Sequence, residues 1–374
     1  MVHLNIKNAI IHESKEIGID AIGFALCGDF NNIEPVLADR VKKEFLSGFE
    51  TWDIKKGIDP SLLLDGCRTM ISAALSYNID KSLIKQKSEY GFKANMSRSS
   101  WGMDYHKVMK DKLGGLAAYI EKKFDAKAKI FVDSNPLLER EIARRAGIGF
   151  TGKNCSIISP IFGSYIFLGE ILTDLKIDPD DPVDDSCGNC DLCIKACPSG
   201  ALCEEYTLNA KKCVSYLTQI KDIPEEYYGN MKYNIYGCDA CQDVCPRNKN
   251  APAVNHPEFI PKEWNAYPDA LRILNMDNKT FKETFKGTSC GWRGKKNIQK
   301  NALIAISNSK NKSNAKYLLK MLSDERNDIR KVCIYAIYNL LNDGSKDILE
   351  EHLKTERDVE IREIIKKLIG LTGQ

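Results

Sequence analysis

The chain has 374 residues, 43% of them hydrophobic and 28% charged, and a formal net charge of +3. This composition supports roughly two or three buried cores and excludes an intrinsically disordered chain. No run of about 18 uninterrupted apolar residues occurs, and His3, Asn5 and Lys7 stand where a secretory signal needs an apolar core. We therefore expect a cytoplasmic protein with no membrane partner. Its 14 cysteines then indicate metal ligands or reactive thiols, because a reducing compartment disfavours disulfides.

The first part of the chain alternates strand-like apolar runs with amphipathic segments. The pattern predicts strands at 19–26, 69–77, 129–132 and 164–171, and helices at 105–124 and 136–146. Asp133 to Asn135 are positioned before the second helix as turn or N-cap residues. A Pro and Asp cluster at 178–185 breaks both periodicities. We predict an α/β domain over residues 1–178, in a protein of overall class α+β.

The next part, residues 179–255, is rich in cysteines at fixed spacings. Cys187, Cys190, Cys193 and Cys197 with Pro198 reproduce the bacterial ferredoxin run, in which three thiolates hold one cubane and the fourth reaches a second. The chain supplies a partner set further on, made of Cys213, Cys238, Cys241 and Cys245 with Pro246. Crossing the fourth ligands assigns Cys187, Cys190, Cys193 and Cys245 to cluster one, and Cys197, Cys213, Cys238 and Cys241 to cluster two. The spacing thus predicts a ferredoxin-like domain with two neighbouring 4Fe-4S clusters.

Two four-cysteine zinc sites are the competing interpretation. Closed zinc sites usually take two Cys-x2-Cys hooks, and that pattern leaves the triple hook and both Cys-Pro pairs unexplained.

The last part, residues 256–374, has a helical texture and a basic segment. Residues 325–330 (ERNDIR) are echoed by 356–362 (ERDVEIR), and each copy leads into an apolar helical stripe. Such a repeat favours stacked helical hairpins of the HEAT type, with a plain helical bundle as the alternative. Residues 286–323 contain nine Lys or Arg and no Asp or Glu, so the rest of the chain has a formal net charge of −6. The segment favours a polyphosphate partner, unless it is only a solvated helix face.

Several longer motifs resemble one known family, epoxyqueuosine reductase. They are SRSSWGMDYH at 97–106, VDSNPLLER at 132–140, AGIGFTGKN at 146–154, GSYIFLGEILTDL at 163–175, CVSYLTQ at 213–219 and GWRGKKN at 291–297, together with both cluster motifs. The resemblance covers nearly the whole chain, and it is more specific than the ferredoxin run alone.

The resemblance implies that the N-terminal domain binds cobalamin beside the clusters and reduces the epoxide of a modified base at the wobble position of tRNA, the last step of queuosine biosynthesis. Asp133 matches the acid that protonates the leaving oxygen and also lies at the cofactor. Further cobalamin contacts are implied for Ser97, Ile157, Leu168, Ser215 and Gln219.

Two interpretations of Asp133 stay open. An Asp after a strand and before Ser-Asn-Pro is commonly an N-cap. To act as an acid, its pKa would need to be raised by apolar, cofactor-covered surroundings. One departure from the family pattern lies nearby, because this chain has Lys56 and Gly57 where relatives often carry Arg.

The partners implied are the tRNA anticodon stem-loop and an external electron donor such as flavodoxin or ferredoxin, and we expect a monomer. The residues expected to contact RNA phosphates are Lys221, Arg293, Lys295, Lys296 and Lys300. The alternatives are another cobalamin and iron-sulfur reductase, such as a reductive dehalogenase, or a ferredoxin-type electron carrier. Roughly 180 residues before the clusters and 130 after them are too many for a carrier.

Overall fold

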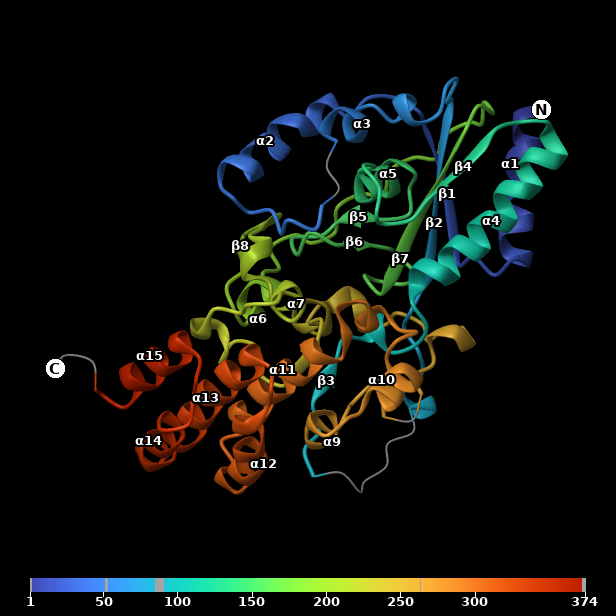
Figure 1. Ribbon diagram of the computed structural model, residues 1–374. Helices are drawn as coiled ribbons and strands as arrows, with labels where there is room; N and C mark the ends of the chain where they lie inside the picture. Colours follow the sequence, from blue (N-terminus) through green and yellow to red (C-terminus); the bar gives the residue numbers. More distant parts are fainter. Residues whose placement is uncertain (1, 51–52, 85–90, 263, 372–374) are drawn as a thin grey trace. The chain divides into compact units, whose positions relative to one another are not determined.

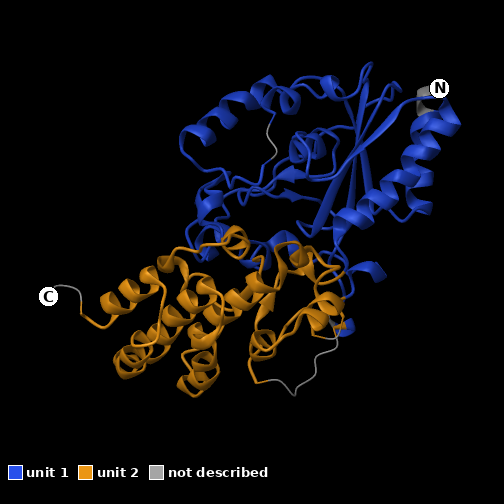
Figure 2. Cartoon of the chain, in the orientation of Figure 1, with its two compact units in different colours: residues 1–83, 103–213, 239–260 blue, residues 84–102, 214–238, 261–374 orange. Residues whose placement is uncertain are grey.

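The computed structural model describes residues 2–50, 53–84, 91–262 and 264–371. The chain forms two compact units, each assembled from separate stretches of sequence (Figure 2). Unit 1 comprises residues 1–83, 103–213 and 239–260, and unit 2 comprises 84–102, 214–238 and 261–374. The mixed helix and sheet content agrees with the class expected from the sequence. In the part of the chain that the structure describes, no helix has the length and apolarity needed to cross a bilayer.

Unit 1 is built on a four-stranded antiparallel sheet in the order β1-β2-β7-β4 (Figure 1). The strands are β1 (Ala21–Leu26), β2 (Thr69–Ser76), β7 (Ile166–Thr173) and β4 (Ala128–Phe131). All four lie where the apolar runs predict strands. The central strand β2 is buried along its whole length, because helices cover both faces of the sheet.

The two faces of this sheet carry separate cores. Helices α1 (Val2–Glu16) and α4 (Tyr105–Phe124) lie on one face, and α5 (Glu139–Arg145) lies on the other (Figure 1). Gly169 on β7 lets α4 approach closely, because a Cβ there would lie 2.8 Å from Met109 and Leu113. Helix α4 has the bounds expected from its periodicity, whereas α5 starts three residues later than expected, since its N-cap is Leu138.

The remaining elements of unit 1 are short. They are α2 (Glu34–Lys42), α3 (Ile54–Ile58), β5 (Phe150–Thr151), β6 (Ile157–Ile158), α6 (Leu192–Ala196), β8 (Leu202–Glu204), β9 (Thr207–Leu208) and α8 (Ala240–Asp243).

Unit 2 is mainly helical and has one small parallel pair, β3 (Asn95–Met96) with β10 (Asn234–Tyr236). Its helices are α7 (Val214–Leu217), α9 (Ala270–Leu274), α10 (Asn278–Thr284), α11 (Gly294–Asn308), α12 (Ala315–Leu319), α13 (Asn327–Leu341), α14 (Lys346–Leu353) and α15 (Val359–Leu368). The long helix α11 is buried from Asn297 to Ser307 and packs against α9, α13 and β10. It is therefore the centre of this unit's core.

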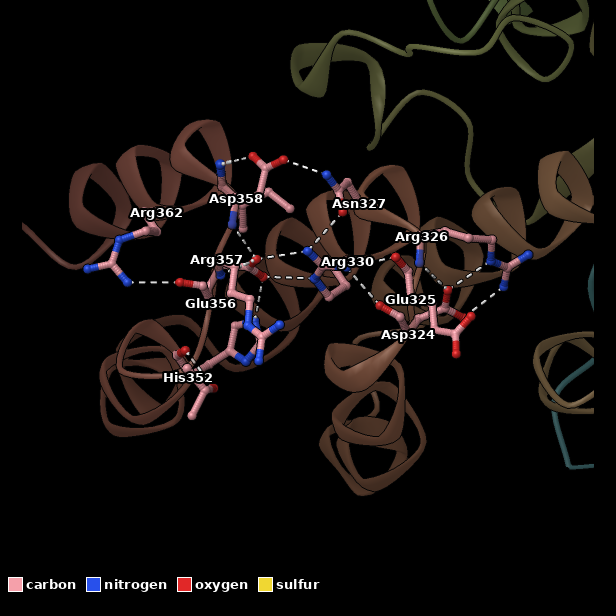
Figure 3. A network of polar contacts seen from close by, with 12 residues as sticks. Asp324, Glu325, Arg326, Asn327, Arg330, His352, Glu356, Arg357, Asp358 and Arg362 are labelled. Carbon is pink, nitrogen blue, oxygen red and sulfur yellow. Dashed lines mark hydrogen bonds and ion pairs between the residues drawn. The ribbon is translucent and has the colours of Figure 1, made fainter.

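The two copies of the sequence repeat span the starts of α13 and α15 and contact each other (Figure 3). Arg330 on α13 makes a bidentate ion pair with Glu356, with both N to O distances at 2.8 Å. Asn327 at the start of α13 donates a hydrogen bond to Asp358, the N-cap of α15. The polar residues of the repeat thus join successive helices of this unit.

Candidate functional site

The four cysteines expected to hold cluster one lie in unit 1. Cys187 and Cys190 are in the loop before α6, Cys193 is in α6, and Cys245 follows α8, which packs against α6. Burial, followed by nearby negative charges that include Cys245, raises the pKa of the Cys187 and Cys193 thiols. The packing of α6 on α8 thus brings the segment with the triple hook next to the segment with Cys245.

The second expected set is divided between the units. Cys197, Cys213 and Cys241 belong to unit 1, and Cys238 is the last residue of a unit 2 segment. Among the described residues, no three His, Cys, Asp or Glu side chains are gathered closely enough for a single metal ion.

Lys153 is a charged residue beside the cluster-one cysteines that motif reasoning did not single out. Its backbone N–H donates to the Cys187 sulfur. Its buried ammonium donates to the carbonyl of Gly188 and to Glu205, both at 2.6 Å. A fixed positive charge therefore lies next to thiolates that would carry negative charge.

The loop that carries Cys241 and Cys245 is tied to the end of the sheet. Gln242 donates to the carbonyl of Ser164 at 2.9 Å and to the hydroxyl of Tyr77 at 3.0 Å. Asn248 accepts from the Ser164 N–H at 2.7 Å and donates to the Gln242 carbonyl at 2.8 Å. These bonds fix the loop without using any cysteine.

Asp133 lies directly after β4, in the left-handed region with φ +52°. Helix α5 is capped by Leu138, without a side-chain hydrogen bond. The N-cap interpretation of Asp133 is therefore wrong, because the chain makes a turn of several residues before the helix begins. The turn interpretation is confirmed by the Asn135 N–H, which donates to the Asp133 carbonyl at 2.6 Å.

An aspartate-histidine-aspartate arrangement surrounds the Asp133 carboxyl. His106 Nε2 lies 3.1 Å from Asp133 Oδ2, and its Nδ1 lies 2.8 Å from Asp104, the N-cap of α4. Hydrogen bonds to these two carboxylates raise the pKa of His106 to about 9. The hydrogen bond from His106 in turn lowers the pKa of Asp133.

This electrostatic setting differs from the expectation for a carboxylic acid in apolar surroundings. The Asp133 side chain is 55% exposed in this structure and is paired with a cation. At neutral pH the transferable proton therefore lies on His106, within hydrogen-bond distance of the Asp133 carboxylate.

Two further carboxyl groups, missed by sequence reasoning, lie close to this loop. Burial and the charge of Asp133 raise the pKa of Glu139 to about 7. Burial also raises the pKa of Glu170, which is fully buried on β7 and faces Glu139. Glu170 stands between Gly169 and Ile171 in an otherwise apolar strand, and such a position is the signal that could have revealed it.

The residues expected to bind cobalamin fall into two groups. Ile157 and Leu168 belong to unit 1, where they pack into the core on the α5 side of the sheet. Ser97, Ser215 and Gln219 belong to unit 2.

Within unit 2 the last strand brings its three expected residues together. The Ser97 N–H donates to the Tyr236 carbonyl at 2.9 Å, and a Cβ on Gly237 would lie 2.4 Å from the Ser97 Cβ. Gln219 accepts from the Tyr236 hydroxyl at 3.1 Å and donates to the Ser215 carbonyl at 2.9 Å. The sequence segments 97, 215–219 and 236–237 thus form one small polar site.

The absence of a side chain at Gly57 has a structural reason. It is buried, and a Cβ there would lie 2.7 Å from the Pro136 carbonyl oxygen in the Asp133 loop. A larger residue would displace this loop.

The residues expected to contact RNA differ in accessibility. Lys221 and Lys296 are exposed, and Lys296 pairs with Asp328 at 2.6 Å. Lys295 is partly exposed, and the Arg293 guanidinium lies 3.7 Å from the ring centroid of Trp292. Lys300 needs a correction, because it is buried and donates to the carbonyls of Ile220 and Lys221. Burial lowers the pKa of Lys300 to about 8, and its position is that of a structural residue.

A double ferredoxin-type motif attached to a sheet unit with an acid-base pair defines an iron-sulfur oxidoreductase. Residues 186–248 match the family model described as a 4Fe-4S double cluster binding domain, and residues 58–134 match the one described as epoxyqueuosine reductase QueG, DUF1730. An epoxyqueuosine reductase of Bacillus anthracis is 40% identical over 374 residues, which cover 99% of this chain and 98% of the relative. The chain belongs to the epoxyqueuosine reductase family and carries a double 4Fe-4S cluster domain.

Solved structures agree with this assignment. A crystal structure of epoxyqueuosine reductase with an epoxyqueuosine-modified tRNA-Tyr stem loop has a TM-score of 0.92 and 38% identity, and the match covers 98% of this chain and 99% of that one. A structure of the Bacillus subtilis enzyme, with its catalytic aspartate loop swung out of the active site, has a TM-score of 0.92 and 37% identity, and covers 99% of this chain and 100% of that one.

Proposed function

We propose that this chain reduces epoxyqueuosine to queuosine at the wobble position of tRNA, the last step of queuosine biosynthesis. The observation that carries the proposal is the Asp133–His106 pair, which lies in the same unit as most of the cluster cysteines. Relatives of matching length carry the same activity in their names. A reductive dehalogenase or a simple electron carrier is not favoured by these similarities.

We propose that cobalamin is bound by the residues that the resemblance to the family implies. Ile157 and Leu168 in unit 1 are apolar, and Ser215 and Gln219 in unit 2 are polar. The corrin ring needs both kinds of group, since its faces are apolar and its rim carries amides. When bound, cobalamin supplies a reducing metal centre that is fed single electrons by the eight-cysteine clusters.

The chain's own acid-base groups supply one of the protons that the reaction consumes. Loss of the epoxide oxygen as water, with formation of the alkene, consumes two electrons and two protons. His106 holds a proton 3.1 Å from Asp133. We propose that Asp133 takes this proton and passes it to the leaving oxygen, because a carboxylate hydrogen-bonded to an imidazolium is ready for such a relay. The second proton has no assigned donor.

We also propose a role for unit 2 in docking RNA. The exposed Lys221 and Lys296 and the partly exposed Lys295 would contact phosphates, and α11 to α15 would form a HEAT-like array behind them. Trp292 is 56% exposed and lies under the Arg293 guanidinium. An aromatic side chain so placed can stack on a base that has left its helix.

The remaining proposals concern organisation. We propose a cytoplasmic monomer that takes electrons from flavodoxin or ferredoxin. Its functional regions are the cobalamin domain at 1–178, the cluster domain at 179–255 and the tRNA-docking domain at 256–374.

Mass spectrometry of tRNA nucleosides tests the function directly. In a strain lacking this protein, epoxyqueuosine should accumulate in place of queuosine, and anaerobically reconstituted protein should convert it in isolated tRNA. Normal queuosine levels in the deletion strain would contradict the proposal.

The Asp133→Asn variant tests the proton relay. The amide keeps the size of Asp133 but cannot deliver a proton, so iron and cobalamin contents should stay normal while turnover falls by about 100-fold or more. A single-turnover assay with modified tRNA measures this. Turnover equal to that of the wild type would remove Asp133 from the mechanism.

A further inference from the structure

We infer that Glu139 is the positioning residue of Asp133, and that it anchors the Asp133 loop to the centre of the sheet through Glu170. The inference deepens the proposed function, because it concerns the residue that delivers the proton. Nothing in the cysteine motifs or the basic segment points to these two glutamates.

One oxygen of Glu139 holds the loop at two points. The Asp133 N–H donates to Oε1 at 2.5 Å, and the Asn135 side-chain amide donates to the same atom at 2.9 Å. Asn135 then accepts from the Leu137 N–H at 2.8 Å. A left-handed conformation such as that of Asp133, at φ +52°, is uncommon outside glycine, and Asp adopts it where local hydrogen bonds support it. The Glu139 oxygen supplies those contacts.

Glu139 also lies close to Glu170 on β7, the strand against which α5 packs. Glu170 is fully buried, and its Oε2 has no donor among the described residues when both carboxyls are ionised. Burial and then the neighbouring Glu139 raise the pKa of Glu170, and two adjacent buried carboxyls avoid like-charge repulsion by sharing a proton. Ser72 on the neighbouring strand donates to Glu170 Oε1 at 3.5 Å. The loop is therefore linked to the rigid middle of the sheet.

The charged groups around Glu139 are consistent with one shared proton. Arg140 is the nearby cation, while Asp133 and Glu170 are the nearby carboxyls. On α4, Tyr105 and His106 face Asp133, and their hydrogen bonds stabilise its negative charge. With Asp133 ionised, a second buried negative charge beside Glu139 is unfavourable, so the glutamate pair keeps a proton near neutral pH.

A purely helix-related role for Glu139 makes a different prediction. Glu139 is the first residue of α5, where any acid interacts favourably with the helix dipole. Glu141 shares that helix end and makes ion pairs with Arg144 and Arg145. If only the helix mattered, Glu141→Ala would disturb the loop as much as Glu139→Ala.

Hydrogen exchange of the Asp133 amide in the anaerobic holoenzyme tests the positioning role. Glu139→Ala should speed this exchange by at least about tenfold and lower kcat by about 10- to 100-fold, with KM for tRNA unchanged. In Glu139→Gln the exchange rate and kcat should both stay within a few-fold of the wild-type values. The glutamine oxygen accepts the same two hydrogen bonds, and its amide donates to Glu170. Glu141→Ala should leave the exchange unchanged.

The inference is overturned if Glu139→Ala leaves the amide protected, or if Glu139→Gln loses protection to the same extent. Infrared spectroscopy gives a second readout: a protonated-carboxyl band should disappear in both Glu139→Gln and Glu170→Gln, and its absence from the wild type would refute the shared proton. If the exchange follows this pattern while no form of the protein acts on epoxyqueuosine, the proposed function fails and the positioning role stands.

Discussion

At the scale of single residues, the position of Lys153 has a consequence for electron transfer. Its ammonium is buried, hydrogen-bonded to the Gly188 carbonyl in the first cysteine loop, and close to Cys187 and Cys190. Adding an electron to a cluster adds negative charge, and a buried cation stabilises that charge far more than a hydrated one does. Lys153 should therefore raise the reduction potential of cluster one.

Replacing this lysine by methionine tests the effect. Lys153→Met keeps most of the side-chain volume but removes the charge, so the midpoint potential of cluster one should become more negative. An anaerobic redox titration followed by EPR measures the shift.

Lys195 is the matched control for this substitution. It lies between Cys193 and Cys197 in sequence, but its side chain is 71% exposed, so water screens its charge. Lys195→Met should shift the potential much less than Lys153→Met. Equal shifts in the two variants would contradict a special role for the buried charge.

At the scale of elements, a buried ion pair joins α13 to the segment before α15 (Figure 3). The side chains of Arg330 and Glu356 are 13% and 1% exposed, and Glu356 also contacts His352 on α14 at 3.1 Å. The hydrogen bonds from Arg330 lower the pKa of Glu356 to about 2. This ion pair also joins the two copies of the sequence repeat, because Arg330 belongs to the first copy and Glu356 to the second.

Removing one partner should destabilise this helical region strongly. Arg330→Met leaves a buried carboxylate without its cation, and such losses cost about 3–5 kcal/mol. Lys331→Met is the control on the same helix: its partner Glu360 is 70% exposed, and surface pairs contribute about 0–1 kcal/mol. Thermal unfolding followed by circular dichroism compares the three proteins, and equal destabilisation by the two substitutions would contradict the assignment.

The pH dependence of this pair has a definite sign. Because the pKa of Glu356 falls from 4.5 to about 2 on folding, its stabilisation is present above 4.5 and is lost as the pH falls towards 2. The difference in free energy of unfolding between wild type and Arg330→Met should be constant from neutral pH to about 5. It should become smaller below that pH.

The elements that are most easily predicted from the sequence are those with strong local patterns. The strands of unit 1 and helix α4 follow from apolar periodicity, and α4 has the predicted bounds. The cysteine spacing similarly indicates the cluster domain. The Glu139–Glu170 pair could not be predicted, because its members are brought together only when β7 and α5 pack in three dimensions. Lys300 was misjudged for the same reason, since charge along a sequence does not reveal which face of α11 is buried.

At the scale of the whole molecule, the chain is interleaved in a way that periodicity does not reveal. Residues 84–102 and 214–238 join unit 2 although they flank unit 1 segments in sequence. As a result, the expected cofactor residues Ser97 and Gln219 belong to a different unit from Asp133. Neither unit alone contains the complete set of expected residues.

The basic residues of unit 2 give the whole-molecule prediction. Lys295 and Lys296 lie in the first turn of α11 with Lys296 exposed, and unlike Lys300 they are not committed to backbone carbonyls among the described contacts. If they contact phosphates, reversing both charges should raise KM for tRNA, while reduction of a free epoxyqueuosine nucleoside stays unchanged. The salt dependence of tRNA binding should also weaken, by about one unit of logarithmic slope per lost contact.

Lys366→Glu supplies the control, since Lys366 is a surface lysine of α15 paired with Glu363. It changes the net charge in the same direction but lies outside the basic segment, so KM for tRNA should change little. Steady-state kinetics at several salt concentrations separate these cases. Equal loss on tRNA and on the free nucleoside, or an effect of Lys366→Glu as large as that of the double reversal, would show that the basic segment does not dock RNA.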